Sequence, residues 1–144
     1  MDNRLICICG PTASGKTALS IALAKQFHTE IISADSMQIY RELDIGTAKA
    51  TPEEQAQAIH HMIDFLDPRE SFSVARYVEM ADRCAQDILS RGKTPIIVGG
   101  TGLYIDSLIR CDSFSGDEAD QGIREKYQKM ALDEGNTAVH ERLR

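Results

Sequence analysis

The stretch GPTASGKT at residues 10–17 constrains the fold of this chain more than any other feature. It has the pattern G-x-x-x-x-G-K-T and directly follows the apolar run Leu5–Cys9. In such a loop the glycines let several backbone N–H groups point inward, and the following helix adds the partial positive charge of its N-terminus. The pattern therefore predicts a strand, a phosphate-binding loop and a helix in succession, with a diphosphate or triphosphate as the ligand.

Two side chains of this loop carry chemistry. Lys16 supplies a mobile positive charge for a phosphate group, and the hydroxyl of Thr17 is suited to bind Mg²⁺. The residues expected to contact the phosphates are Gly10, Pro11, Thr12, Ala13, Ser14, Gly15, Lys16 and Thr17. The alternative is a chance match in a glycine-rich turn, and the flanking strand and helix patterns argue against it.

Short β-rich runs alternate with helical stretches along residues 5–110, which is typical of a parallel sheet with crossover helices. The sequence therefore predicts an α/β fold: a P-loop NTPase-like parallel sheet with flanking helices. Strands are expected at 5–9, 30–34, 61–65 and 95–98, and helices at 16–27, 52–59, 74–91 and 103–109. A capping box at Thr51 and an N-cap at Ser73 mark two of the predicted helix starts.

The composition changes after Cys111. Residues 112–120 are polar and acidic, and the rest of the chain has the pattern of two helices separated by Gly135 and Asn136. We expect a domain boundary near Asp112, with the P-loop core in 1–111 and a helical domain beginning in 112–144; an ordinary surface loop is the alternative. The last residues continue a helical pattern without a C-terminal cap, which indicates a domain that is cut short.

Charge and cysteine content narrow the class of protein. The formal net charge is −6, which argues against a broad nucleic-acid surface on this stretch. The cysteines have no zinc-ligand spacing, and Cys7 and Cys9 are expected on one face of a strand as small core residues. No apolar run approaches about 18 residues and no leader precedes the first strand, so we expect a cytoplasmic protein without a membrane segment.

A carboxylate follows the second predicted strand. Asp35 opens the stretch DSMQIY, and the carboxyl ends of parallel strands are where such sheets bind ligands. We expect it to face the phosphate loop as a base or as a ligand of magnesium-bound water; a simple turn cap through Ser36 is the alternative. The apolar strand 95–98 ends in Gly-Gly-Thr-Gly rather than Asp, which favours a transferase over a motor or switch ATPase.

Six blocks in order make the resemblance to one family specific. They are GPTASGKT, DSMQIY, GTAK (46–49), HHMID (60–64), FSVARY (72–77) and GGTGLY (99–104). Together they resemble the bacterial tRNA dimethylallyltransferase (tRNA isopentenyltransferase) family over about residues 5–110. The resemblance implies transfer of a dimethylallyl group from dimethylallyl diphosphate to the exocyclic amine of the adenosine following the anticodon, with release of pyrophosphate.

The resemblance also implies roles for residues. Gly10 to Thr17 hold the donor diphosphate with Mg²⁺ at Thr17, and Asp35, Thr17 and Lys16 are the expected catalytic residues. The residues expected to contact tRNA are Asp35, Ser36, Met37, Gln38, Thr101 and, in the segment matching a helical insertion domain, Arg124. Family members are roughly twice as long, so the acidic balance describes only the donor-site half; we expect a monomer.

Other charged residues have plainer interpretations. Lys49 and Arg76 could lie near a phosphate, but solvated surface positions are the expectation. His60 and His61 point to opposite faces of a strand, so they are interpreted as packing or hydrogen-bonding residues rather than metal ligands. Turn formation is an equal alternative for Thr101.

Three other functions stay open at this point. An adenylate isopentenyltransferase acting on free nucleotides would share the loop and the base, and a small-molecule or nucleoside kinase would hold ATP in the same loop. The kinase interpretation lacks support because no Arg-rich lid is recognisable in the sequence. A nucleotide-binding regulatory module would have no use for a carboxylate facing the phosphates.

Overall fold

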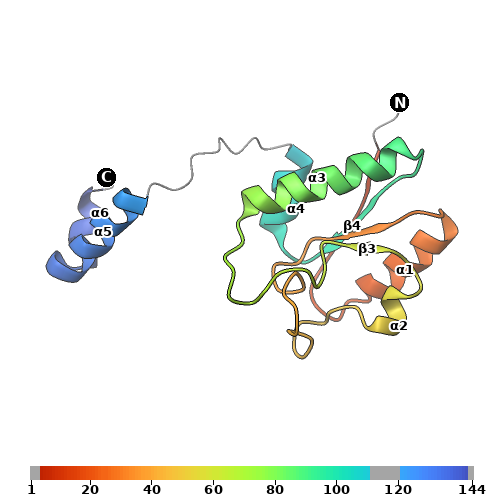
Figure 1. Cartoon of the computed structure of the whole chain (residues 1–144), viewed down its shortest axis with the longest axis horizontal. Helices are drawn as coiled ribbons and strands as arrows, with labels where there is room; N and C mark the ends of the chain where they lie inside the picture. The colour runs from red at the N-terminus through yellow and green to blue at the C-terminus, as the bar shows by residue number, and fades with distance from the viewer. Residues whose placement is uncertain (1–3, 111–120, 143–144) are drawn as a thin grey trace. The chain divides into compact units, whose positions relative to one another are not determined.

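The computed structural model describes residues 4–110 and 121–142 (Figure 1). The chain forms two compact units, Met1–Asp112 and Ser113–Arg144. The expected boundary at Asp112, Cys111 and the acidic stretch 112–120 lie outside the described residues.

A parallel sheet with the strand order β1-β4-β2-β3 is the framework of the first unit. Its strands are β1 (Ile6–Cys9), β2 (Ile31–Ser33), β3 (His60–His61) and β4 (Ile96–Gly99). Its helices are α1 (Lys16–Gln26), α2 (Pro52–Gln55), α3 (Val74–Ser90) and α4 (Gly102–Arg110). The expected α/β class with a parallel sheet is confirmed.

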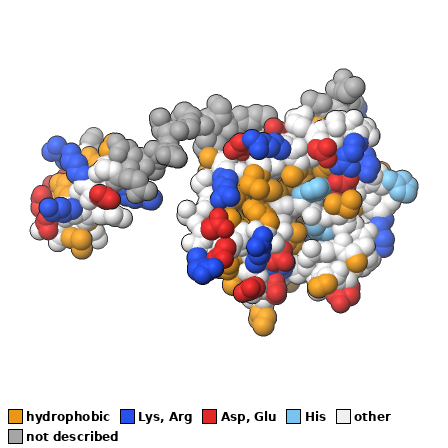
Figure 2. All heavy atoms as spheres, in the orientation of Figure 1, with side chains coloured by type: hydrophobic (Ala, Val, Ile, Leu, Met, Phe, Trp, Pro, Cys, Tyr) orange, Lys and Arg blue, Asp and Glu red, His pale blue; other side chains and the backbone are white. Residues whose placement is uncertain are grey.

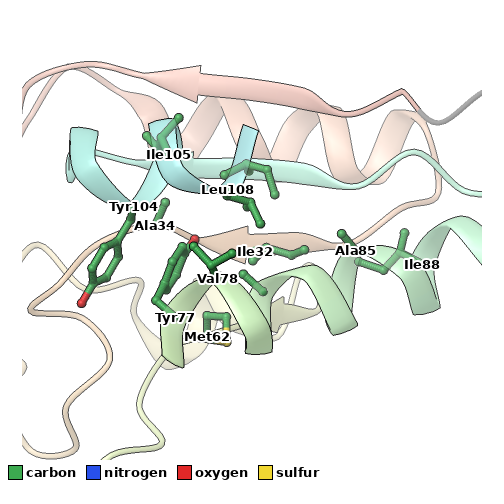
Figure 3. Packing of buried hydrophobic residues seen from close by; sticks show 12 residues of the cluster. Ile32, Ala34, Met62, Tyr77, Val78, Ala85, Ile88, Tyr104, Ile105 and Leu108 are labelled. Atoms are coloured by element: carbon green, nitrogen blue, oxygen red, sulfur yellow. The ribbon is translucent and has the colours of Figure 1, made fainter. Parts of the chain in front are cut away.

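Alternation along the central strands builds a core on each face of the sheet. Ile31 and Ile96 pack with Ile21 and Ala24 of α1. Their neighbours Ile32 and Ile97 belong to the other core cluster, to which α3 and α4 contribute (Figure 3). Because successive side chains of a strand point to opposite faces, the two strands are buried on both sides, as parallel sheets require.

Two tyrosines pack against each other in the core cluster that contains Ile32 and Ile97. The rings of Tyr77 and Tyr104 stack with their centroids 4.1 Å apart (Figure 3). The fully buried Tyr77 hydroxyl donates to the carbonyl of Ser33 at 3.1 Å. This bond connects α3 to the end of β2, just before the turn that begins at Asp35.

The ends of α3 follow the sequence signals. The Ser73 hydroxyl accepts a hydrogen bond from the Arg76 N–H at 3.2 Å, and Gly92, just past the helix, has φ 72°. The left-handed conformation suits glycine because it has no Cβ. The predicted start and stop of this helix are confirmed.

Two predicted elements are shorter than expected. The capping box forms at Thr51, but α2 ends at Gln55 because the chain already pairs with β2 at Ile59, whose carbonyl accepts from the Ile31 N–H at 2.9 Å. The strand predicted at 61–65 is present but much shorter, and it begins one residue earlier. Only His60 and His61 pair with β2, since Met62 and Asp64 have φ of 60° and 56°, which no strand accommodates.

Cys7 and Cys9 lie on one face of β1 as expected, with their sulfur atoms 3.3 Å apart. Cys7 packs against the core, where burial raises its pKa to about 12. Cys9 is exposed, so its expected core position is wrong. It is the last residue of β1, a strand at the edge of the described sheet.

The second unit contains two helices, α5 (Gln121–Glu134) and α6 (Asn136–Arg142). Gly135 separates them with φ 86°. The predicted split at Gly135 is confirmed.

Candidate functional site

The loop between β1 and α1 has the backbone of an anion site. Ala13 and Gly15 adopt φ of 64° and 85°, which curls the chain tightly before the helix. Gly15 is the N-cap residue of α1 and has no side chain that could occupy the first N–H groups of the helix. Lys16 Nζ donates to the carbonyl of Pro11 at 2.6 Å, which places the ammonium against the loop itself.

A cavity of about 440 Å³ brings this loop together with the end of β2. Thr12, Ala13, Gly15, Lys16 and Thr17 line it from the loop, and Ser33, Asp35 and Gln38 line it from β2 and the following turn. Its remaining lining includes Thr47–Ala50, His60, Ile63 and Val98. The cavity therefore combines an anion-binding backbone, a carboxylate and an apolar part, within the usual size range of ligand sites.

Asp35 has a fixed orientation at this cavity. Its Oδ1 accepts hydrogen bonds from the N–H groups of Met37 at 2.9 Å and Gln38 at 3.4 Å. These bonds hold the side chain over its own turn, and Asp35 lines the same cavity as Lys16 and Thr17. Asp35 therefore caps its own turn and also lines the cavity that the loop between β1 and α1 lines.

The neighbouring loop after β4 is tied to the Asp35 turn. The Thr101 hydroxyl accepts from the Ser36 N–H at 3.0 Å, and the Thr101 N–H donates to the Ala34 carbonyl at 3.1 Å. A Cβ on Gly99 would overlap the Ala34 carbonyl, so only glycine lets β4 lie this close to the end of β2. Thr101 thus supports the turn, and it does not line the cavity.

Other expected site residues lie elsewhere. Gly10 and Pro11 line a second cavity of about 360 Å³ together with Gly100 and Asp106. Met37 is 48 % exposed and outside the main cavity. Arg124 is exposed on α5, in the other compact unit.

The amide of Gln38 is engaged within the chain. Its Nε2 donates to the carbonyls of Thr47 at 3.2 Å and Ala48 at 3.0 Å, and its Oε1 accepts from the Ser33 hydroxyl at 3.4 Å. In this conformation Gln38 connects the end of β2 to the segment Thr47–Ala50.

The expectation that Lys49 is a solvated surface residue is wrong. Its side chain is 4 % exposed and it lines the cavity. In the sequence only the GTAK motif (46–49) pointed to Lys49, because the acceptors of its ammonium come from elsewhere in the chain. Arg76, by contrast, lies over the Phe72 ring and outside the cavity.

The two histidines make the hydrogen bonds that were expected of them. A ring nitrogen of His60, Nδ1, lies 2.8 Å from the Ala58 carbonyl, and burial lowers the pKa of this cavity residue. His61 Nε2 lies 2.8 Å from Glu30 Oε2. Within residues 4–110 and 121–142, no three His, Cys, Asp or Glu side chains form a metal cluster.

The oxygen atoms at the cavity fit Mg²⁺. Thr17 offers a hydroxyl and Asp35 a carboxylate, and both line the same space. Mg²⁺ prefers oxygen ligands and is commonly held by few protein groups together with phosphates and water. The donor set therefore suits a magnesium ion that arrives with a phosphate ligand.

The surface and helices of the described chain add two observations. On the face of the first unit drawn in Figure 2, Lys and Arg side chains alternate with Asp and Glu rather than forming a continuous basic patch. None of the helices described has the length and apolar character needed to cross a membrane.

The fold and the loop define the class. A parallel α/β sheet with a tightly curled, glycine-containing loop between β1 and α1 is a P-loop NTPase-like architecture, here with a carboxylate after β2, one strand away across β4. A sequence model of the IPP transferase family matches residues 38–144, and one of isopentenyl transferases matches residues 3–69. The chain belongs to the IPP transferase family.

Individual relatives agree with this assignment. The tRNA dimethylallyltransferase of Caldanaerobacter subterraneus is 50% identical over 144 residues, which is 100% of this chain and 46% of that protein. The enzyme of the same name from Bacillus mycoides is 53% identical over 136 residues, 94% of this chain and 43% of the relative. The chain thus spans a little under half the length of these relatives.

Solved structures show the same fold. The tRNA isopentenylpyrophosphate transferase of Bacillus halodurans aligns with a TM-score of 0.76 at 44% identity, covering 99% of this chain and 47% of that one. A eukaryotic dimethylallyltransferase, described as acting on tRNA, aligns with a TM-score of 0.74 at 30% identity over 94% of this chain and 37% of that one.

Proposed function

We propose that this chain is the donor-binding part of an enzyme that transfers a dimethylallyl group from dimethylallyl diphosphate to tRNA. The acceptor is the exocyclic amine of the adenosine 3′ to the anticodon, and pyrophosphate is released. The observation that carries the proposal is a single cavity lined by Lys16, Thr17 and Asp35. The names of the relatives, tRNA dimethylallyltransferase and tRNA isopentenylpyrophosphate transferase, support the substrate pair.

In this proposal the loop Gly10–Thr17 holds the diphosphate. Backbone N–H groups at the start of α1 and the Lys16 ammonium stabilise the negative charge that grows on the diphosphate as its carbon–oxygen bond breaks. A magnesium ion held at Thr17, when bound, would neutralise part of that charge. No ATP is consumed.

Asp35 is the proposed base. The exocyclic amine of adenine is a poor nucleophile, because its lone pair is delocalised into the ring. As the nitrogen–carbon bond forms, a carboxylate oxygen of Asp35 accepts the proton that the amine loses. The hydrogen bonds from Met37 and Gln38 orient the carboxylate before the substrate arrives.

The acceptor base must leave the stack of the anticodon loop to reach the cavity, as in other enzymes that modify bases. The proposal assigns tRNA contacts to residues 35–38, to Thr101 and to Arg124. It also places the enzyme, as a monomer, in the cytoplasm.

The test uses a chimera in which this chain replaces the matching 144 residues of the Caldanaerobacter subterraneus relative. The chimera is incubated with labelled dimethylallyl diphosphate and either tRNA or free AMP, and the tRNA is then digested. A five-carbon addition on the adenosine beside the anticodon supports the proposal. Labelling of AMP alone would indicate an adenylate isopentenyltransferase, and consumption of ATP with a small alcohol acceptor would indicate a kinase.

Replacing the proposed base separates catalysis from donor binding. Asp35→Ala in the chimera should reduce turnover by at least about 10²-fold, because the amine loses its proton acceptor. The affinity for dimethylallyl diphosphate should change little, because the loop Gly10–Thr17 is unaltered. Single-turnover kinetics and donor titration measure the two quantities, and near-normal turnover would remove Asp35 from the mechanism.

A further inference from the structure

One wall of the cavity is the segment Thr47–Ala50, which has no regular secondary structure. Helix and strand hydrogen bonds therefore do not hold this wall in place. Its position depends on side chains that reach it from other parts of the chain.

Lys49 makes the strongest of these connections. Its ammonium donates to the Tyr40 carbonyl at 2.7 Å, to Asp44 Oδ1 at 2.6 Å and to Asp64 Oδ1 at 2.9 Å. An ammonium has three N–H donors, so these acceptors use all of them. Burial by itself would lower the pKa of Lys49, but the bonds to Asp44 and Asp64 outweigh it and raise the pKa.

The contacts of Lys49 join backbone positions that are strained. Ala48, next to Lys49, has φ 49°, and Asp64, which accepts from Lys49, has φ 56°. Glu42, which lies between the acceptors Tyr40 and Asp44 in the sequence, has φ 63°. A non-glycine residue in the left-handed region costs on the order of 1 kcal/mol and persists only where surrounding contacts hold it. The ammonium bonds supply such contacts.

Gln38 connects this wall to the proposed base. Its side chain donates to the carbonyls of Thr47 and Ala48, and its backbone N–H donates to Asp35 Oδ1. A displacement of Thr47–Ala50 would therefore also displace Gln38 and the turn that carries Asp35.

We propose that Lys49 is a positioning residue of the donor cavity. Through Asp44 and Asp64 it holds Thr47–Ala50 in the conformation that lets the cavity accept a diphosphate, and its own ammonium does not bind the phosphates. The inference rests on the proposed function, since it assigns a role to a residue of the same site.

The two roles that Lys49 could have at an anion site predict opposite effects of one substitution. If Lys49 positions the wall, Asp64→Asn weakens pyrophosphate binding, because the wall loses an anchor. If Lys49 bound phosphate directly, Asp64→Asn would free its ammonium and strengthen binding. Lys49→Met weakens binding in both cases, so Asp64→Asn decides between them.

The experiment titrates this 144-residue chain with inorganic pyrophosphate and Mg²⁺ by calorimetry, at a temperature where circular dichroism shows every variant folded. We expect Lys49→Met and Asp64→Asn each to weaken binding by about tenfold. Because both substitutions break the same bond between Lys49 and Asp64, the double variant should bind pyrophosphate no more weakly than Lys49→Met alone. Additive effects of the two substitutions would instead indicate independent destabilisation of the fold and would overturn this inference.

Arg83→Met is the matched control, since it removes the exposed ion pair between Arg83 and Glu79 on α3, outside the cavity. It should leave the affinity unchanged. Tighter binding by Asp64→Asn, or unaltered binding by Lys49→Met, would overturn this inference alone. Absence of pyrophosphate binding by the unsubstituted chain would overturn the proposed function and this inference with it.

Discussion

Glu30 lies just before β2 with 3 % of its surface exposed, and three basic side chains surround it. Both carboxylate oxygens accept from the Arg91 guanidinium, Lys93 Nζ lies 3.3 Å from Oε1, and His61 Nε2 lies 2.8 Å from Oε2. The bonds from Arg91 outweigh the effect of burial and, with those from His61 and Lys93, lower the pKa of Glu30 to about 2. A buried carboxylate with these partners makes the folded state sensitive to acid.

The stability of the chain should therefore depend on Glu30 below neutral pH. The folded pKa is lower than the unfolded one, so the contribution is complete above the unfolded pKa of about 4.3. It is lost as the pH falls toward the folded pKa of about 2. Urea unfolding at pH 7 and at pH 3 should show a larger loss of stability for the unsubstituted chain than for Glu30→Gln.

At pH 7, Glu30→Gln should cost about 2 kcal/mol, because the hydrogen bonds from Arg91 and Lys93 lose their charged acceptor. Other carboxylates also titrate in acid, and the comparison between the two chains removes their common contribution. An equal acid sensitivity of the two chains would show that Glu30 does not set it.

At the scale of elements, β4 decides how the site is assembled. It pairs with β1 on one side and with β2 on the other, so it places the phosphate loop and the Asp35 turn at the same carboxyl end of the sheet, one strand apart. The close approach of Gly99 to Ala34 brings the loop after β4 against the Asp35 turn. The sheet order thus makes one cavity from loops far apart in the sequence.

Gly99→Ala should damage this arrangement. The added Cβ would overlap the backbone at Ala34, and backbone cannot move aside as a flexible side chain can. We expect a loss of about 3 kcal/mol or more in unfolding free energy, with weaker pyrophosphate binding. Thermal and urea denaturation measure the loss.

Gly102→Ala is the control, because a Cβ there would have no heavy atom within 4 Å. It should leave stability nearly unchanged. Equal stability of the two variants would mean that β2 and β4 can separate at little cost.

At the scale of the whole molecule, the chain spans 46% of the Caldanaerobacter relative and 47% of the Bacillus halodurans structure. The described part carries the proposed donor cavity. The formal net charge of the whole 144-residue chain is −6, whereas binding of tRNA requires clustered positive charge. These 144 residues thus carry the proposed site for the dimethylallyl donor, whereas their net charge does not favour the binding of tRNA.

The chain by itself should bind pyrophosphate weakly and modify tRNA poorly. The chimera with the rest of the Caldanaerobacter relative should restore modification, because it adds the remaining length of that protein. Parallel assays of labelled tRNA with the chain and with the chimera test this. Full turnover by the chain would show that the reaction does not need the remaining length of the Caldanaerobacter relative.

The sequence by itself determined the features that depend on local pattern. The curled loop between β1 and α1, the α/β class, the capped start of α3 and the break at Gly135 were predictable, because turn chemistry, capping and alternation act over a few neighbouring residues. The position of Asp35 at a strand end followed from the same reasoning.

The tertiary structure alone decided the features that depend on distant partners. Lys49 is buried because Asp64 and Asp44 meet it, Gln38 is engaged because Thr47 and Ala48 lie beside it, and β3 ends after His61 because the chain turns through left-handed residues. Such contacts depend on which segments the fold places side by side, and patterns over a few neighbouring residues cannot predict which segments these are.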